Sequence, residues 1–208
     1  MGTLGQLKSA IATELAEGWI SSDARIADAI NQAIADYQDE PFYFVEEIDT
    51  AAFTTVANQQ AYALPADFLK PDLVQITVSG RKYTIRPIPY AELQDLDAAS
   101  NSVSSYPDRY AIYGQQIYLY PRPNGAYTGT IHHRYKLGAP LADGNTNAWT
   151  DDAEELIRQA VKAKICANHL ERDEDAVKYG QLAEMQRERL LRKTRRMVGS
   201  SRVARASL

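Results

Sequence analysis

The chain has 208 residues, of which 45% are hydrophobic and 24% charged, with a formal net charge of −4. This composition is enough for a packed core in one domain or two small ones. Charged residues interrupt every hydrophobic run well before the roughly 20 residues that a membrane-spanning helix needs. The single cysteine, Cys166, excludes a disulfide within the chain and fits a reducing, cytoplasmic context.

Two amphipathic helices are expected at the N-terminal end. Apolar residues recur at three- to four-residue spacing between positions 4 and 15, and again between positions 26 and 37. Pro41 is expected to end the second helix. The short connection between the two stripes favours an antiparallel helical pair.

The middle of the chain, from Phe42 to Tyr135, is rich in Tyr, Val, Ile and Thr and is interrupted by Pro and Gly, which predicts strands. Phe42–Val45 is expected to begin the first strand. Ser79-Gly80-Arg81 and Gly114-Gln115 are typical of hairpin turns. A short helix is expected over Pro89–Leu96, because proline favours the first positions of a helix.

The last third returns to a helical pattern. Thr150 is expected to cap a helix whose first residues are acidic, and a final helix is expected to start at Asp173. The predicted fold is therefore α+β. A four-helix bundle, with two N-terminal and two C-terminal helices, spans residues 1–41 and 150–196, a β-rich lobe is inserted over residues 42–149, and an extended C-terminal arm covers residues 197–208.

The charge is distributed unevenly along the chain. Residues 187–208 hold eight of the 23 basic residues and one of the 27 acidic residues, so this segment carries +7 while residues 1–186 carry −11. The end of the chain has too few apolar residues to fold on itself, and it is expected to order on a partner. Its docking residues are predicted to be Arg195, Arg196, Met197, Val198, Arg202, Val203, Arg205 and Leu208.

Three interpretations of this basic arm remain open. It could bind the phosphates of a nucleic acid, or dock on a protein surface, or be a solvated helix end whose charges complement the helix dipole. The absence of aromatic residues from positions 197–208, which would stack on bases, favours docking on a protein.

One loop resembles a calcium-binding loop in its spacing. Counted from the first residue, positions 1, 3, 5, 9 and 12 are occupied by Asp143, Asn145, Asn147, Asp151 and Glu154. Ala148 stands at position 6, where such a loop requires glycine, and a strand is expected before it. An Asx-rich loop that leads into a capped helix is the favoured interpretation, and calcium is the alternative.

No residue pattern predicts an enzyme, a cofactor or a metal site. His132 and His133 alternate across a strand, as do Glu46 and Glu47, so neither pair can converge on one ligand. Cys166 extends an apolar helical stripe and is expected to be an inert, buried thiol. A hydrolase that uses Glu46, Glu47 or His169 remains the weaker alternative.

Two phrases resemble the head-to-tail connector, or adaptor, proteins of tailed bacteriophages, which include the tail accessory factors of short-tailed phages. Residues 62–68 read YALPADF, similar to a Tyr-x-Leu-Pro-x-Asp-Phe phrase of these proteins. Residues 110–123 read YAIYGQQIYLYPRP, similar to their Tyr-x-x-x-Gly-x-x-Ile-x-Leu-x-Pro-x-Pro hairpin. The order of helical pair, strands, Asp/Asn loop and second helical pair is also similar.

The resemblance implies a structural virion protein without enzymatic activity. Made in the host cytoplasm, it would form a homo-oligomeric ring, usually dodecameric, at the head-tail junction. The ring would bind the portal protein above and tail, stopper or nozzle proteins below, and it would continue the channel for genomic DNA. The C-terminal segment would reach the portal. Nucleic-acid binding through the basic arm is the alternative function, and cell-wall hydrolysis is a weaker one.

Overall fold

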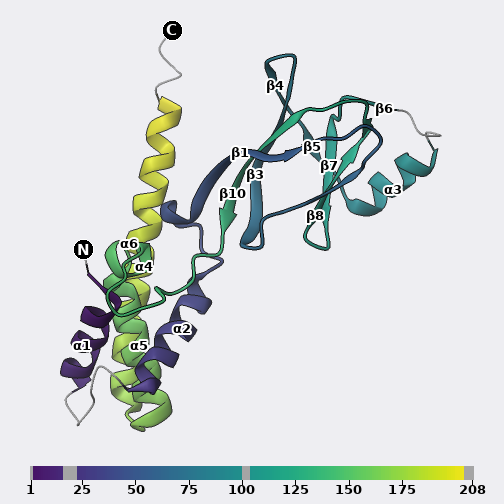
Figure 1. The fold of residues 1–208 in the computed structure, drawn as a ribbon. Helices are drawn as coiled ribbons and strands as arrows, with labels where there is room; N and C mark the ends of the chain where they lie inside the picture. The colour runs from purple at the N-terminus through teal and green to yellow at the C-terminus, as the bar shows by residue number, and fades with distance from the viewer. Residues whose placement is uncertain (1, 16–22, 100–103, 204–208) are drawn as a thin grey trace. The chain divides into compact units, whose positions relative to one another are not determined.

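The computed structural model describes residues 2–15, 23–99 and 104–203, with side chains up to residue 197. The chain divides into two compact units. The helical unit comprises Met1–Phe44 and Leu137–Leu208, and the β unit comprises Val45–Lys136. Figure 1 labels the helices and strands of both units.

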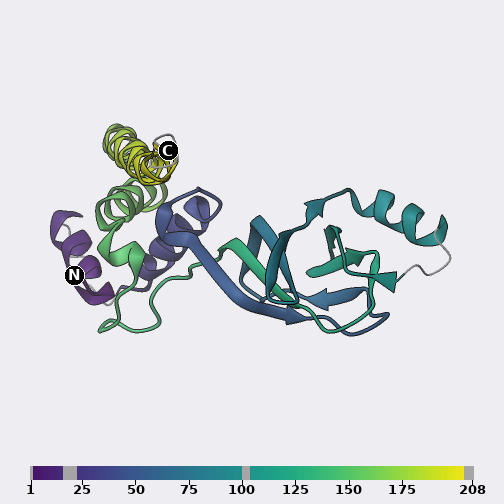
Figure 2. The same cartoon turned by 90° about the horizontal axis from the view of Figure 1, so that it is seen from above.

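The helical unit is organised around one central helix. Its described helices are α1 (Leu4–Leu15), α2 (Ala24–Tyr37), α4 (Ala148–Asp151), α5 (Glu154–His169) and α6 (Asp173–Val203). Helix α5 packs against α6 on one side and against α1 and α2 on the other, as Figure 2 shows. Its buried residues Leu156, Ile157, Val161 and Ile165 supply this contact because they recur at helical spacing on opposite flanks.

The predicted four-helix bundle is wrong. In such a bundle four helices of similar length surround one core. Here α1, α2 and α5 have 12, 14 and 16 residues, whereas α6 has 31. At 1.5 Å per residue, α6 is about 46 Å long and its partner α5 only about 24 Å, so α5 can cover no more than part of α6. The fold is α+β, with its helices grouped around α5.

The predicted extended arm is also corrected over the residues that the structure describes. Helix α6 starts at Asp173, as predicted, but it continues through Gly199-Ser200-Ser201 to Val203. Glycine inside a helix costs only about 1 kcal/mol relative to alanine. A long helix that is already formed adds one hydrogen bond for each further residue, so it can absorb this cost.

The strands of the β unit pair antiparallel except in two short parallel pairs. Its strands are β1 (Glu46–Thr54), β2 (Ala61–Ala63), β3 (Phe68–Val78), β4 (Arg81–Thr84), β5 (Arg86–Pro87), β6 (Ser104–Ser105), β7 (Arg109–Tyr113), β8 (Gln116–Tyr120), β9 (Arg122–Pro123) and β10 (Thr128–Tyr135). One sheet has the order β1-β10-β3-β4 and a second has the order β2-β8-β7-β5, with a parallel pair β6-β9 beside them. Helix α3 (Tyr90–Ala99) packs against β7 and β8 (Figure 1).

A single hydrophobic core lies within the β unit. Val74, Ile76 and Ile131 from the first sheet cluster with Ile117 and Leu119 from the second. Each sheet contributes every second residue because strand side chains alternate between faces.

One position in this core accepts only glycine. Phe53 lies opposite Gly129 in the ladder, and a Cβ at that glycine would stand 2.3 Å from the Phe53 ring. The ring therefore occupies the space that a side chain on β10 would need.

Both predicted hairpin turns are confirmed. Ser79 and Gly80 have φ values of 49° and 77°, and Gly114 and Gln115 have values of 58° and 60°. Two consecutive residues with positive φ are the mark of the type I′ turn, whose twist matches that of the flanking strands. The turns join β3 to β4 and β7 to β8. The short helix that was expected from Pro89 is present as α3.

Candidate functional site

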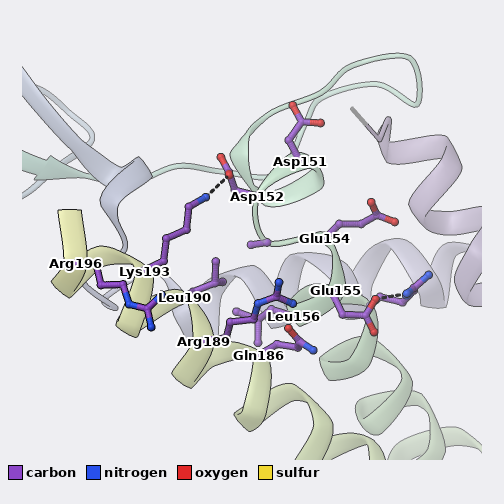
Figure 3. A pocket seen from close by; sticks show the side chains of 12 residues that line it. Asp151, Asp152, Glu154, Glu155, Leu156, Gln186, Arg189, Leu190, Lys193 and Arg196 are labelled. Atoms are coloured by element: carbon purple, nitrogen blue, oxygen red, sulfur yellow. Dashed lines mark hydrogen bonds and ion pairs between the residues drawn. The ribbon is translucent and has the colours of Figure 1, made fainter.

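A charged cleft of about 520 Å³ lies within the helical unit, between α6 and the start of α5 (Figure 3). We call it the charged cleft. Acidic side chains come from α4 and the first turn of α5, and most of the basic ones come from α6. The residues that line the cleft are Asp151, Asp152, Ala153, Glu154, Glu155, Leu156, Arg158, Gln186, Arg189, Leu190, Lys193 and Arg196.

The basic wall follows from the periodicity of α6. Arg189, Lys193 and Arg196 are spaced by four and three residues, which places them on one face of the helix, and all three are exposed. Leu190 and Thr194 lie on the buried side and hold the helix against the rest of the unit. The Thr194 hydroxyl accepts a hydrogen bond from the backbone N–H of Tyr43 at 3.1 Å and donates one to the carbonyl of Leu190 at 3.1 Å.

The acidic wall is positioned by a capping box. The Asn147 side chain accepts a hydrogen bond from the backbone N–H of Trp149, and the Thr150 hydroxyl is within 3.0 Å of the Asn147 backbone N–H, which donates to it. Thr150 is thus the third residue of α4 and not the predicted cap. The short helix ends at Asp151, and α5 then begins at Glu154 with its acidic residues at the positive end of its dipole.

An aromatic cluster fixes this turn in the helical unit. Trp149 is fully buried, and its ring meets Phe44 edge-on at 5.2 Å and Phe42 edge-on at 6.1 Å. Its indole N–H donates to the carbonyl of Leu137 at 2.6 Å. The strand predicted to begin at Phe42 is therefore wrong over its first residues, because residues Tyr43–Val45 form a 3-10 turn that directs these rings toward Trp149.

The two walls are joined at one end by three side chains. The Lys193 ammonium donates to the Tyr43 hydroxyl at 2.5 Å and to the Asp152 carboxylate at 3.2 Å. The Tyr43 hydroxyl also donates to Asp152. The hydrogen bond to Tyr43, together with the bond to Asp152, raises the pKa of Lys193, so this lysine carries its full charge at neutral pH.

The floor of the cleft contains a second charge network. Burial raises the pKa of Glu155, but the hydrogen bond from Gln159 and the charge of Arg158 outweigh it, so the pKa of this carboxyl lies below its usual range. Arg158 also lies 3.3 Å from the Glu14 carboxylate of α1. Both carboxylates of this network are paired with Arg158, which suits recognition of charged surfaces more than proton transfer.

The predicted docking residues lie on α6 and beyond it. Arg195 and Arg196 are exposed, and Met197 is 50% exposed. Of these three side chains, that of Arg196 lines the charged cleft. Val198, Arg202 and Val203 belong to the helical backbone of α6. The predicted docking residues Arg205 and Leu208 lie outside the described residues.

The residues considered for chemistry lie in different local environments. His133 is buried and stacks on Phe68 at 5.3 Å, with Glu47 at 3.9 Å, while His132 points to the other face of β10. Cys166 is buried, and this burial raises the pKa of its thiol. Glu46 and Glu47 belong to the β unit and His169 to the helical unit. Among the described residues no three His, Cys, Asp or Glu side chains are grouped to hold a metal ion.

The calcium-like spacing has a different role in the structure. Asp143 lies 2.6 Å from the ammonium of Lys8, and its carbonyl accepts a hydrogen bond from the backbone N–H of Gly5. Asn147 is occupied as the cap of α4. The loop therefore attaches α1 to the helical unit and starts the next helix.

Sequence reasoning missed the cleft itself. Tyr43 and Asp152 gave no local signal, because their partner Lys193 is 150 and 41 residues away along the chain. The one available signal was the spacing of Arg189, Lys193 and Arg196, which marks a basic helix face.

Comparison with known protein families identifies the family to which this chain belongs. The family model of the SU10 adaptor protein matches residues 2–206. A search of curated proteins found no match. The chain belongs to the SU10 adaptor protein family, and it is a structural component of a bacteriophage virion that interacts with other virion proteins. The predicted resemblance to phage adaptors is thereby confirmed. In the described part of the chain, none of the helices has both the length and the hydropathy required to cross a membrane.

Proposed function

We propose that this protein forms the adaptor ring between the portal and the tail, and that the ring continues the channel through which genomic DNA passes. The observation that carries the proposal is the family match over residues 2–206. Tail, stopper or nozzle proteins would bind the opposite side of the ring, which by resemblance to other connectors would have twelve copies. The resemblance also locates the ring at the head-tail junction.

The C-terminal part of α6 is the proposed contact with the portal. The last buried side chain that the structure describes on this helix is that of Thr194, and Arg195, Arg196 and Met197 after it are exposed. These three side chains therefore lie outside the core of the helical unit. The net charge of +7 over residues 187–208 favours an acidic acceptor surface.

The charge of the rest of the chain supports the channel function. Residues 1–186 carry a net charge of −11. A wall of the same sign as DNA repels its phosphates and does not retain the strand during passage. Basic residues gathered at one end can bind a protein partner without lining the passage.

A portal-binding assay tests the proposal. The full-length protein, a variant that lacks residues 197–208, and a variant with Arg195→Glu and Arg196→Glu are measured for binding to the purified cognate portal by biolayer interferometry. The deletion is expected to abolish binding, and the double charge reversal to weaken it about tenfold or more, because each lost charge contact at an interface costs about 1–2 kcal/mol.

The matched control is Lys178→Glu, which changes an exposed basic residue near the other end of the same helix. It should bind the portal as the unmodified protein does. A truncated protein that still binds the portal with unchanged affinity would overturn the assignment of this contact. If the full-length protein instead binds duplex DNA, with an affinity that falls steeply between 50 and 200 mM salt, the nucleic-acid alternative gains.

A further inference from the structure

The first sheet of the β unit has two free edges. In the order β1-β10-β3-β4, strands β1 and β4 each pair with a neighbour on one side only among the residues that the structure describes. An edge strand presents a row of backbone N–H and C=O groups that can pair with another strand. Both edges belong to the β unit, and Figure 1 shows the two strands by their labels.

The β1 edge is acidic. Glu46 and Glu47 are exposed and Asp49 is partly exposed, and Ile48 between them has 59% of its surface accessible. Two basic side chains of β10 neighbour this group: the buried His133, whose Nε2 lies 3.9 Å from the Glu47 carboxylate, and Arg134, which is opposite Glu46 in the ladder and lies 3.6 Å from Asp72. The three carboxylates of β1 itself give this edge its acidic character.

The β4 edge is basic. All four residues of β4 are exposed, beginning with Arg81 and Lys82, and Tyr83 is 43% exposed. Tyrosine combines an apolar ring with a polar hydroxyl group and is therefore favoured at protein interfaces. The sheet therefore has opposite charges on its two free edges.

The opposite charges lie on matching faces of the sheet. Asp49 is opposite Ile131, which is opposite Val74. Tyr83 is opposite Ile76, two residues from Val74 and hence on the same face. Glu47 and Arg81 share the face of Asp49 and Tyr83, since each lies two residues away along a regular strand. Glu46 and Lys82 occupy the other face.

The lengths of the two edges also match. The ladder of β1 is regular over Glu46–Asp49, and an irregularity follows between Asp49 and Phe53. The regular segment has the same length as β4, which has four residues. Charged residues on edge strands often prevent association, but that effect needs like charges to meet. Here the two edges attract each other.

We propose that β4 of one copy of this chain adds to β1 of the next copy, so that the sheets of neighbouring copies become continuous. The contact is head-to-tail, because each copy uses two different edges, and repeated contacts of this type produce a ring or a filament. The inference rests on the proposed function in that it supplies a contact between copies in the adaptor ring.

Charge-reversed variants test the pairing by complementation. The first variant has Glu46→Lys and Glu47→Lys, so both of its edges are basic. The second has Arg81→Glu and Lys82→Glu, so both of its edges are acidic. Self-association of the full-length protein is measured by sedimentation velocity at low salt, where charge attraction is least screened. Each variant alone is expected to associate about tenfold or more weakly than the unmodified protein.

An equimolar mixture of the two variants should regain association, because the basic β1 of the first meets the acidic β4 of the second and the reverse contact is also attractive. Circular dichroism checks that both variants are folded. Association that is unchanged in the single variants, or that fails to return on mixing, would overturn the pairing.

Disulfide trapping gives a second readout that does not depend on strong association. In the antiparallel register that sets Glu46 opposite Lys82, Glu47→Cys of one copy lies opposite Arg81→Cys of the next, close enough for a disulfide. The native Cys166 is buried and does not interfere. Oxidation should link this variant into a ladder of multimers. The control, Ile48→Cys with Arg81→Cys, places the thiols on opposite faces and should remain largely unlinked.

The outcomes separate this inference from the proposed function. If the unmodified protein stays monomeric and the Glu47–Arg81 variant is not trapped more than the control, the edge pairing is wrong. If the charge variants then still bind the portal, the adaptor function stands with another contact between copies. If portal binding also fails in the unmodified protein, the proposed function is wrong independently.

Discussion

The two units of this protein are built on different principles. The helical unit joins two distant chain segments, and its contacts link residues such as Phe44 with Trp149 and Glu14 with Lys162. The β unit is one continuous insertion, residues 45–136, with its own core. Because the core cluster of the β unit is formed by its own residues, we expect that damage to the core of one unit leaves the other unit folded.

The largest effect is expected from Trp149→Ala. This change removes a fully buried ring, two edge-on aromatic contacts and the hydrogen bond to Leu137. It should destabilise the helical unit by about 3–5 kcal/mol. Hydrogen exchange monitored by mass spectrometry should show loss of protection in α5 and α6 only. The milder Trp149→Phe is the control, and equal loss of protection in the β unit would contradict the independence of the units.

The reciprocal change is Ile117→Ala in the β unit. Ile117 is fully buried between the two sheets. Its truncation should cost about 2–5 kcal/mol and lower protection in β7, β8 and β10. The exposed Gln116→Ala on the same strand should have almost no effect in the same exchange experiment. Loss of protection in α5 would show that the units are coupled.

A smaller effect is expected from Asn147→Ala. The change removes the cap of α4 and the hydrogen bond from the Asn147 side chain to the carbonyl of Gly138 at 2.8 Å. Loss of such a cap typically costs about 1 kcal/mol. Urea unfolding followed by far-UV circular dichroism should report it. Asn145→Ala, which alters an exposed residue of the same loop, is the matched control, and an equal effect of both changes would argue against the cap.

The smallest effect concerns pH and the β unit. Bidentate hydrogen bonds from Arg122 to Asp97, at 2.9 and 2.6 Å, hold the pKa of that carboxyl below its usual range. The pair therefore stabilises α3 fully above the ordinary pKa of aspartate, about 3.9, and this contribution is lost as the pH falls through the lowered value. Thermal unfolding should separate Asp97→Asn from the unmodified protein at pH 7, with a difference of less than about 1 kcal/mol since the arginine is partly exposed.

The stability difference between Asp97→Asn and the unmodified protein should become smaller toward pH 3. The exposed Asp95→Asn on the same helix should not show this pH dependence. A stability difference between Asp97→Asn and the unmodified protein that is the same at every pH would show that the effect comes from packing and not from charge.

Local chemistry in the sequence predicted much of this fold. The turns at Ser79-Gly80 and Gly114-Gln115 were predictable because positive φ angles select particular residues at adjacent positions. The start of α6 at Asp173 was also predictable, because three acidic residues favour the beginning of a helix.

The errors came from contacts between distant residues. The segment Phe42–Val45 has residue types that are typical of a strand, but the Phe42 ring packs against Trp149 in an aromatic cluster. The four-helix bundle was inferred from the number of helices, whereas the actual packing depends on their lengths. The charged cleft needs Lys193 next to Tyr43 and Asp152, and no spacing within one segment reveals such a meeting.

Native mass spectrometry of the full-length protein mixed with its cognate portal is the decisive test of the adaptor-ring function. We expect a closed ring of this chain bound to the portal, and loss of that complex when residues 197–208 are deleted. A small oligomer that is the same with and without the portal would contradict the adaptor-ring function, while leaving the two-unit fold intact.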